Sequence, residues 1–366
     1  MKIKIHILHS SLNVNGNELA FLFPLKFNSK LLRNDYGISI NYFRNITDDL
    51  YECDVLIVSS WIIGRELKWW EGSTDKIFEF LETAKSKVAK VIWFDLSDST
   101  GTPQFLVLPY IDTYLKCQIL TDKNQYLKKK YANRVFTGYY NEEFNVLDDD
   151  SGEDHLGEVP SINDLSKIKV GWNTGMANYS CYSSYWSILS HYIKAVDFPL
   201  FYPTRWVSPY SQRTTDFSCR VGYSYVRNTV AYQRKEIARI LQRKIPVDKL
   251  KRGRYFSEME SSKICISPFG LGEITLRDFE IIISGSAIFK ANCDHMATWP
   301  NLFVKDVTYL DYKWDLSDFE EKLEFYISQP ELVNEVANNC QGIYKNLLTT
   351  KSGHHQFCQR FFEFVK

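Results

Sequence analysis

The sequence lacks the paired cysteines that mark structural metal sites and disulfide scaffolds. Its eight Cys are scattered singly from Cys53 to Cys358, and no two are spaced as CxxC. This pattern argues against a zinc ribbon and against a disulfide-rich secreted domain. We therefore expect reduced thiols in a cytoplasmic protein.

The sequence also has no excess of positive or negative charge and no long apolar run. Lys plus Arg and Asp plus Glu both total 44, so the net charge is zero and no nucleic-acid partner is expected. No run of about 18 apolar residues predicts a transmembrane helix, and His6 and His9 interrupt the N-terminal run that a signal peptide would need. Peripheral contact with the inner face of a membrane stays open, through Trp69–Trp70 and Lys128–Lys130. A core edge and a solvated helix face explain these residues more simply.

Three enzyme signatures are also absent. The sequence contains no GxGxxG fingerprint, no P-loop lysine after a glycine turn and no GxSxG elbow. Their absence counts against a dinucleotide-dependent α/β enzyme and a serine hydrolase. Cys293-Asp294-His295 offers metal-ligand side chains, but a zinc site needs a second set of partners.

Strand and helix patterns alternate along the chain. In the N-terminal part we expect strands at 2–9, 38–43, 54–60, 88–94 and 110–117, and helices at 18–33, 75–86 and 122–131. Further along we expect extended segments at 167–171, 200–202, 264–267 and 286–289, and helices at 182–196, 229–243, 275–284, 316–328, 329–347 and 354–366. This alternation predicts parallel sheets with right-handed crossovers.

An acidic stretch divides the two series. LDDDSGEDHLGEVP, residues 147–160, has few large apolar side chains and is typical of a linker. We expect an N-terminal domain at 1–150, a linker at 151–163, a C-terminal domain at 164–350 and a final helix at 351–366. The fold class is then α/β, with two Rossmann-like domains facing a central cleft where the carboxyl ends of their strands bind ligands.

The stretch SPFGLGEITLRDFE, residues 267–280, joins a strand to a helix. Gly270 and Gly272 permit positive φ angles and close approach of a ligand, and the N–H groups of a helix start attract an anion. Arg277 adds a cation that can clamp a phosphate. Glu273 and Glu280 share one helix face, where a carboxylate can bind sugar or ribose hydroxyls. The same residues also fit a solvated helix with paired charges.

This stretch resembles the donor half of GT-B glycosyltransferases, closest to the bacterial polysaccharide-type and exostosin-like branches. The resemblance rests on Ser262 to Gly270, Gly272-Glu273, Leu276 to Glu280 and the helix reaching Ser284-Gly285. It implies an N-terminal acceptor domain, a C-terminal nucleotide-sugar domain and a C-terminal helix that crosses back to the first domain.

The resemblance also implies roles for single residues. Gly270 and Gly272 would form the glycine-rich turn, Glu273 the first motif carboxylate and Glu280 the ribose contact. The two Glu are seven residues apart, not the eight of the retaining pattern, and position 281 is Ile. Inversion is therefore favoured. The remaining donor-side candidates are a set of basic residues for the diphosphate and one polar residue after the first strand of this domain: Arg220, Arg227, Arg234 and Asn173.

The first domain should supply the base that deprotonates the acceptor. FDLSDSTGT, residues 94–102, places two acids and four hydroxyls after a buried strand. We expect Asp98 or Asp95 to act as the base, with His9 next, because an inverting transferase needs one proton acceptor. A loop whose acids only cap backbone N–H groups is the alternative.

The sequence thus predicts a glycosyltransferase that requires no metal. It would move a sugar from a UDP- or GDP-linked donor to a hydroxyl of a glycan or lipid-linked glycan, in surface polysaccharide (O-antigen- or capsule-like) synthesis. A non-catalytic binding subunit of the same fold and a dinucleotide-dependent enzyme are the alternatives.

Overall fold

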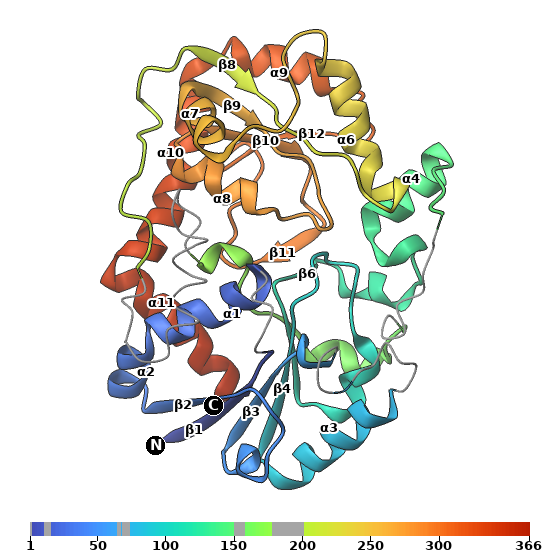
Figure 1. The fold of residues 1–366 in the computed structure, drawn as a ribbon, viewed down its shortest axis with the longest axis vertical. Coiled ribbons are helices and arrows are strands. Elements are labelled where there is room, and N and C mark those ends of the chain that lie inside the picture. Colours follow the sequence, from blue (N-terminus) through green and yellow to red (C-terminus); the bar gives the residue numbers. More distant parts are fainter. Residues whose placement is uncertain (1, 11–15, 64–66, 68–73, 150–157, 178–200) are drawn as a thin grey trace.

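Two parallel sheets organise the molecule, one in each half (Figure 1). The computed structural model describes residues 2–10, 16–63, 67, 74–149, 158–177 and 201–366. The six-stranded sheet has the order β2-β1-β3-β4-β5-β7 and the four-stranded sheet the order β12-β10-β9-β8. Every neighbouring pair within them is parallel. The predicted α/β class with two Rossmann-like domains is confirmed.

The six-stranded sheet and its helices form what we call the first half. Its strands are β1 (Ile3–Leu8), β2 (Ile38–Phe43), β3 (Val55–Ser59), β4 (Lys90–Asp95), β5 (Thr113–Lys116) and β7 (Ile168–Val170). Its helices are α1 (Gly16–Phe27), α2 (Ser29–Asp35), α3 (Asp75–Lys87) and α4 (Val135–Phe144). Strand β3 is buried along its whole length, as its apolar run predicts.

Two helix predictions in this half need correction. The helix expected at 18–33 is two helices that meet at Asn28, whose side-chain amide donates to the Pro24 carbonyl at 2.8 Å. The helix expected at 122–131 is replaced by two 3₁₀ turns, Lys123–Leu127 and Tyr131–Asn133. The helix expected at 182–196 lies outside the described residues, as do Trp69 and Trp70.

The strand predicted at 167–171 exists, but its place was wrong. We expected it to open the second sheet. Instead β7 pairs with β5 through Tyr114–Ile168 and Lys116–Val170 and completes the first sheet. The first sheet therefore takes its last strand from the far side of the acidic stretch in the sequence.

The four-stranded sheet and its helices form the second half. Its strands are β8 (Thr215–Ser218), β9 (Ser262–Ile266), β10 (Ala287–Ala291) and β12 (Leu310–Tyr312). Its helices are α6 (Asn228–Leu241), α7 (Arg252–Ser261), α8 (Leu276–Ile283), α9 (Phe319–Ile327) and α10 (Pro330–Thr349). Phe201 and Tyr202, expected to be extended, belong to no strand.

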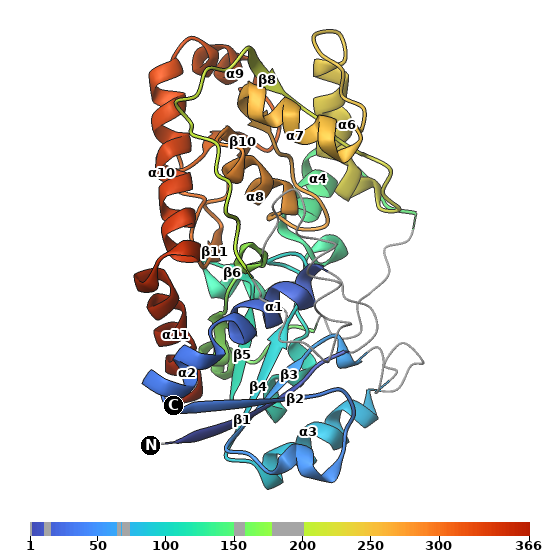
Figure 2. The same ribbon diagram turned by 60° about the vertical axis from the view of Figure 1, so that its left-hand side comes forward.

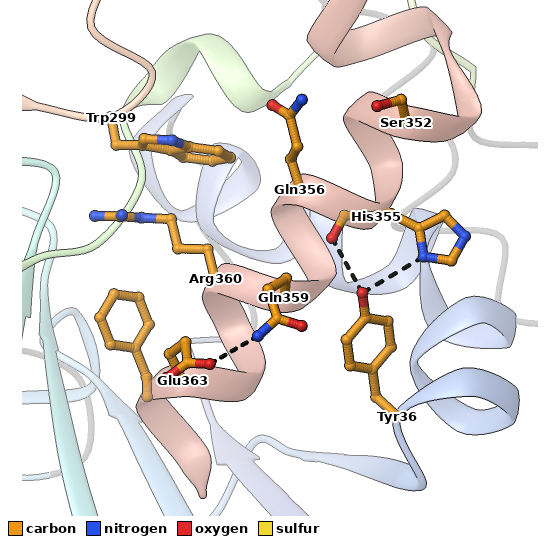
Figure 3. A pocket seen from close by; sticks show the side chains of 9 residues that line it. Tyr36, Trp299, Ser352, His355, Gln356, Gln359, Arg360 and Glu363 are labelled. Atoms are coloured by element: carbon orange, nitrogen blue, oxygen red, sulfur yellow. Dashed lines mark hydrogen bonds between the residues drawn. The ribbon is translucent and has the colours of Figure 1, made fainter.

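The last helix, α11 (Lys351–Val365), crosses back to the first half as expected (Figure 2). The Tyr36 hydroxyl donates to the His355 carbonyl at 3.2 Å. The Arg360 guanidinium donates to the carbonyls of Val170 and Gly171 and lies over the rings of Trp299 and Phe364 (Figure 3). A groove of about 570 Å³ runs along the outer side of this helix. No helix among the described residues is long and apolar enough to cross a membrane.

The halves are joined by more than α11. Strand β6 (Gln118–Leu120) from the first half pairs antiparallel with β11 (Met296–Thr298) from the second. Between the halves, the ring of Trp172 lies 4.7 Å from that of Phe94 and 5.3 Å from that of Phe357. A single hydrophobic cluster consequently runs from one sheet to the other.

Candidate active site

A cleft of about 520 Å³ separates the carboxyl ends of the two sheets. Trp61, Asp98 and Gln118 line it from the first half, and Tyr225 and Arg234 face them from the second. Trp61 follows β3 and Asp98 follows β4, so both stand at the end of the sheet where parallel α/β folds bind ligands. The structure thus has a cleft between the carboxyl ends of the two sheets, where the sequence predicts it.

On the second half, the cleft is bounded by the 267–275 turn between β9 and α8. Thr275 caps α8 in a capping box: the Asp278 carboxylate accepts the Thr275 N–H at 2.8 Å, and the Thr275 side chain accepts from the Asp278 N–H. Asp278 also accepts from Ser267 at 2.6 Å and forms a fully buried ion pair with Lys290 at 3.1 Å. The helix start is therefore held rigidly, with its first N–H groups directed out of the helix.

Two arginines lie near this helix start, Arg234 buried and Arg277 partly buried. Arg234 donates to the carbonyls of Gly222, Pro268 and Phe269, and its guanidinium lies over the Tyr225 ring. Arg277 donates to the Tyr255 hydroxyl at 3.2 Å, and its Nη1 is buried with no hydrogen-bond partner.

Neither arginine has a carboxylate partner within ion-pair distance among the described residues. Burial lowers the pKa of Arg234, and the positive charge of Arg277 lowers it further. Two neighbouring guanidiniums that repel each other, with little water around them, are an arrangement that an anion would stabilise.

Glu280 lies on α8 beside Arg277. Its carboxylate pairs with Arg252 at 3.4 Å and is 12% exposed. Burial raises the pKa of Glu280, while the charges of Arg252 and Arg277 oppose that rise. The Glu280 carboxylate therefore lies close to two cations, Arg252 and Arg277.

Glu273 does not face the cleft. Its side chain is fully buried, and it accepts from the Thr100 hydroxyl at 2.6 Å and the Thr100 N–H at 3.0 Å. His295 approaches it at 3.3 Å. Burial alone would raise the pKa of Glu273, but His295 and Thr100 outweigh burial and lower the pKa to about 2. The sequence left open whether this carboxylate faces a sugar or only caps the helix, and the fold turns it toward the first half.

The glycines of the turn act differently from the expectation. Neither Gly270 nor Gly272 adopts a positive φ. A β-carbon at Gly272 would overlap the carbonyl oxygen of Asp98, so this glycine allows the two halves to touch. A β-carbon at Gly270 would lie 3.3 Å from an Arg234 amino group, so this position keeps space beside the cation.

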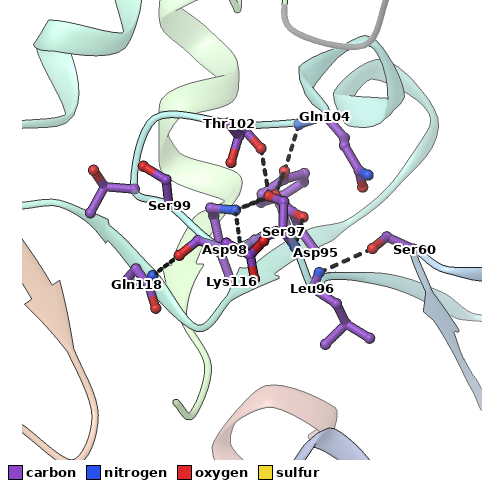
Figure 4. A network of polar contacts seen from close by, with 12 residues as sticks. Ser60, Asp95, Leu96, Ser97, Asp98, Ser99, Thr102, Gln104, Lys116 and Gln118 are labelled. Carbon is purple, nitrogen blue, oxygen red and sulfur yellow. Dashed lines mark hydrogen bonds and ion pairs between the residues drawn. The ribbon is translucent and has the colours of Figure 1, made fainter. Parts of the chain in front are cut away.

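Asp95 and Asp98, the two acids that we expected as candidate bases, lie three residues apart but differ in their surroundings (Figure 4). Asp95 is fully buried and accepts from Lys116 at 2.7 Å and Tyr114 at 2.5 Å. Its ion pair with Lys116 holds the end of β4 to β5. Asp98 is partly exposed and lines the cleft. The structure therefore separates a structural aspartate from a candidate base.

The other predicted residues lie outside the set that lines the cleft. His9 is buried beside Tyr42, and its Nδ1 lies 2.8 Å from the Ser10 carbonyl. Asn173 is buried at the junction of the halves, donating to the Pro300 carbonyl at 2.9 Å. Arg220 forms a bidentate pair with Glu258 at 2.8 and 2.5 Å, and Arg227 lies 3.5 Å from the Ala132 carbonyl.

Sequence reasoning missed Trp61 and undervalued Arg234. Trp61 is 42% exposed although it lies in a cavity. It follows the apolar run of β3 directly, which is the signal that could have identified it as a strand-end residue. Among the residues that the structure describes, no three His, Cys, Asp or Glu side chains are grouped so that they could hold a metal ion. Cys293, Asp294 and His295 therefore do not form such a group.

No protein-family model matches the chain, and no curated protein matches it. Several solved structures are similar over nearly the whole length. A glycosyltransferase from Rickettsia africae ESF-5 is 11% identical, with 100% of this chain and 98% of that chain covered and a TM-score of 0.46. Anabaena Alr3699/HepE in complex with UDP and glucose is 10% identical, with 99% of each chain covered and a TM-score of 0.44.

A sucrose-phosphate synthase from Thermosynechococcus elongatus is 8% identical, with 99% of each chain covered and a TM-score of 0.45. Similarity at this level assigns neither a family nor an activity to the chain.

Proposed function

We propose that this protein is a glycosyltransferase that uses a nucleotide-sugar donor. One observation carries the proposal. Two guanidiniums, that of the buried Arg234 and that of the partly buried Arg277, lie near a capped helix start and have no carboxylate ion pair among the described residues. A diphosphate is an anion of the size and charge that would satisfy both, together with the N–H groups at the start of α8.

The donor would then lie against the second half. Its diphosphate would occupy the helix start, Glu280 would accept a hydrogen bond from the ribose, and the sugar would project into the cleft toward Asp98. The guanidiniums would stabilise the negative charge that develops on the departing nucleotide diphosphate. They would do this without a metal ion.

The acceptor would enter from the first half. Asp98 would take the proton of its hydroxyl as that oxygen attacks the anomeric carbon. Trp61 presents an aromatic face on which a sugar ring can stack. Asp98 is the single carboxylate among the described residues that line the cleft. One carboxylate suits a single displacement, so we propose inversion.

The substrates are proposed from the resemblance to GT-B enzymes. The donor would carry UDP or GDP, and the acceptor would be a glycan or lipid-linked glycan of a bacterial surface polysaccharide at the inner face of the membrane. Among the similar structures, Anabaena Alr3699/HepE was solved with UDP-glucose, and one α-glucosyltransferase with UDP-glucose and DNA.

Calorimetry with UDP, GDP and UDP-glucose tests the donor site. Arg277→Met should abolish UDP or GDP binding, because it removes one of the two cations together with the Nη1 donor that has no hydrogen-bond partner in the protein. Arg239→Ala is the matched control on α6, since Arg239 is 69% exposed. Unchanged nucleotide binding by Arg277→Met would remove the proposed site. Nucleotide binding without any hydrolysis or transfer of the sugar would favour a non-catalytic subunit.

A further inference from the structure

The Glu273 carboxylate belongs to the second half, but most of its hydrogen bonds end in the first. Its two oxygens accept from the Thr100 N–H at 3.0 Å, the Thr100 hydroxyl at 2.6 Å and the Ser99 hydroxyl at 3.3 Å. Glu273, Ser99 and Thr100 are all fully buried. A buried carboxylate with three donors is held far more firmly than an exposed one, because separation would leave a charge without partners.

The backbone around Glu273 makes the same connection. Gly272 approaches the Asp98 carbonyl so closely that no side chain would fit. The Leu271 carbonyl accepts from Arg134 Nε of the first half at 2.7 Å. Three consecutive residues of the 267–275 turn therefore contact the first half.

The loop that receives these contacts carries the proposed base. Residues 97–101 include Asp98, which lines the cleft directly before Ser99 and Thr100. The Gly101 N–H donates to the Ser99 hydroxyl at 3.2 Å, and the Gln118 side-chain amide donates to the Asp98 carbonyl. Ser99 and Thr100 fix one end of this loop, so they limit where Asp98 can lie.

We propose that Glu273 is a positioning residue that fastens the 97–101 loop to the second half and so holds Asp98 at the cleft. It does not contact the sugar. The fastening contact stands on geometry alone, whereas its effect on transfer rests on the proposed function.

His295 supports the carboxylate from the side of the second half. Its Nε2 lies 3.3 Å from Glu273, and its ring lies edge-on to that of Trp314 at 4.9 Å. The backbone carbonyl of His295 accepts the Thr121 N–H at 2.9 Å, next to the β6–β11 pair. The carboxylate is thereby held on both sides of the junction.

Hydrogen exchange of the ligand-free protein tests the fastening contact. Glu273→Gln keeps the shape but places an amide group opposite the donors of Ser99 and Thr100. Exchange at Thr100 and Gly101 should rise about tenfold or more, since a charge-assisted set of bonds is lost. Glu260→Gln is the control, because Glu260 pairs with Arg205 on the surface of the same half. Unchanged exchange at 97–101 in Glu273→Gln would overturn the proposal.

Thr100→Val supplies an independent variant from the other side of the contact. It removes the hydroxyl donor with little change of shape, so it should raise the same exchange rates. Exchange at 97–101 in the double variant should be little faster than in either single variant, since both substitutions remove the same contact between Glu273 and Thr100. Fully additive effects would show that the two residues act separately and would contradict the proposal.

Kinetics separates this role from a sugar contact. If Glu273 positions Asp98, Glu273→Gln should lower kcat about 100-fold while the Kd for UDP and the KM for the donor stay within about twofold. A residue that contacts the sugar would instead weaken UDP-glucose binding and leave exchange at 97–101 unchanged. If the wild-type protein binds no nucleotide, the proposed function fails, and the exchange experiment still decides the fastening contact.

Discussion

At the scale of single residues, burial decides which acid on a loop is available for chemistry. Asp95 and Asp98 are the same type of residue and lie three positions apart in the sequence. Asp95 is the immediate end of β4 and is enclosed by Lys116 and Tyr114, whereas Asp98 reaches the cleft. A sequence shows both acids but does not show which one has an internal cation.

We predict opposite effects for these two acids. Asp98→Asn should lower the rate of transfer about 100-fold or more, because it removes the proposed proton acceptor, and it should lower stability less than Asp95→Asn does, since Asp98 is partly exposed. Asp95→Asn should lower the free energy of unfolding by about 3 kcal/mol, since it leaves Lys116 buried without its partner. Urea denaturation and a transfer assay measure both effects. Equal loss of stability in the two variants would contradict this assignment.

A second residue-scale prediction concerns acid. The pKa of Glu273 is about 2 in the fold against 4.5 in an unperturbed chain, so the unfolded state binds more protons between these values. The stability that Glu273 contributes is therefore complete above about pH 4.5 and is lost as pH falls toward 2. Unfolding curves of the wild-type protein and Glu273→Gln should differ at pH 7, and the difference should shrink steadily below pH 4.5 and be smallest at about pH 2 or below. A constant difference would refute the prediction.

At the scale of elements, the cap of α8 connects stability with the proposed donor site. Thr275→Ala breaks the capping box with Asp278 and should cost about 1 kcal/mol of unfolding free energy and weaken nucleotide binding. Thr275→Ser should restore both, because serine caps as well as threonine. Thr83→Ala on α3 is a control, since the Thr83 hydroxyl bonds only within its own exposed helix turn. Full nucleotide affinity in Thr275→Ala would show that the cap does not organise the site.

Helices and strands with a strong hydrophobic pattern could be predicted from the sequence, but the elements that they pack against could not. The strands expected at 38–43 and 54–60 and the amphipathic helix expected at 229–243 appear close to the expected bounds. Strand β7 was found but assigned to the wrong sheet, because three residues carry no information about which edge they join. The direction of Glu273 was hidden for a similar reason, since Thr100 is 173 residues away.

At the scale of the whole molecule, α11 stabilises the first half from the far end of the chain. Arg360→Ala should lower the free energy of unfolding by about 2 kcal/mol, because the carbonyls of Val170 and Gly171 lose their donor. Hydrogen exchange should increase first at β7 and leave the four-stranded sheet unaffected. Gln359→Ala, an exposed neighbour, is the control. An equal increase in both sheets would contradict a local role for Arg360.

The close approach at Gly272 also bears on how related sequences should be compared. The constraint on this position comes from a carbonyl of the opposite half, and the constraint on Glu273 comes from two hydroxyls and an N–H there. A descendant that had lost the proposed transfer reaction but kept its shape should still retain both. Retention of Gly272-Glu273 during evolution should therefore track the contact between the halves, while Asp98, Arg234 and Arg277 should vary once the reaction is lost.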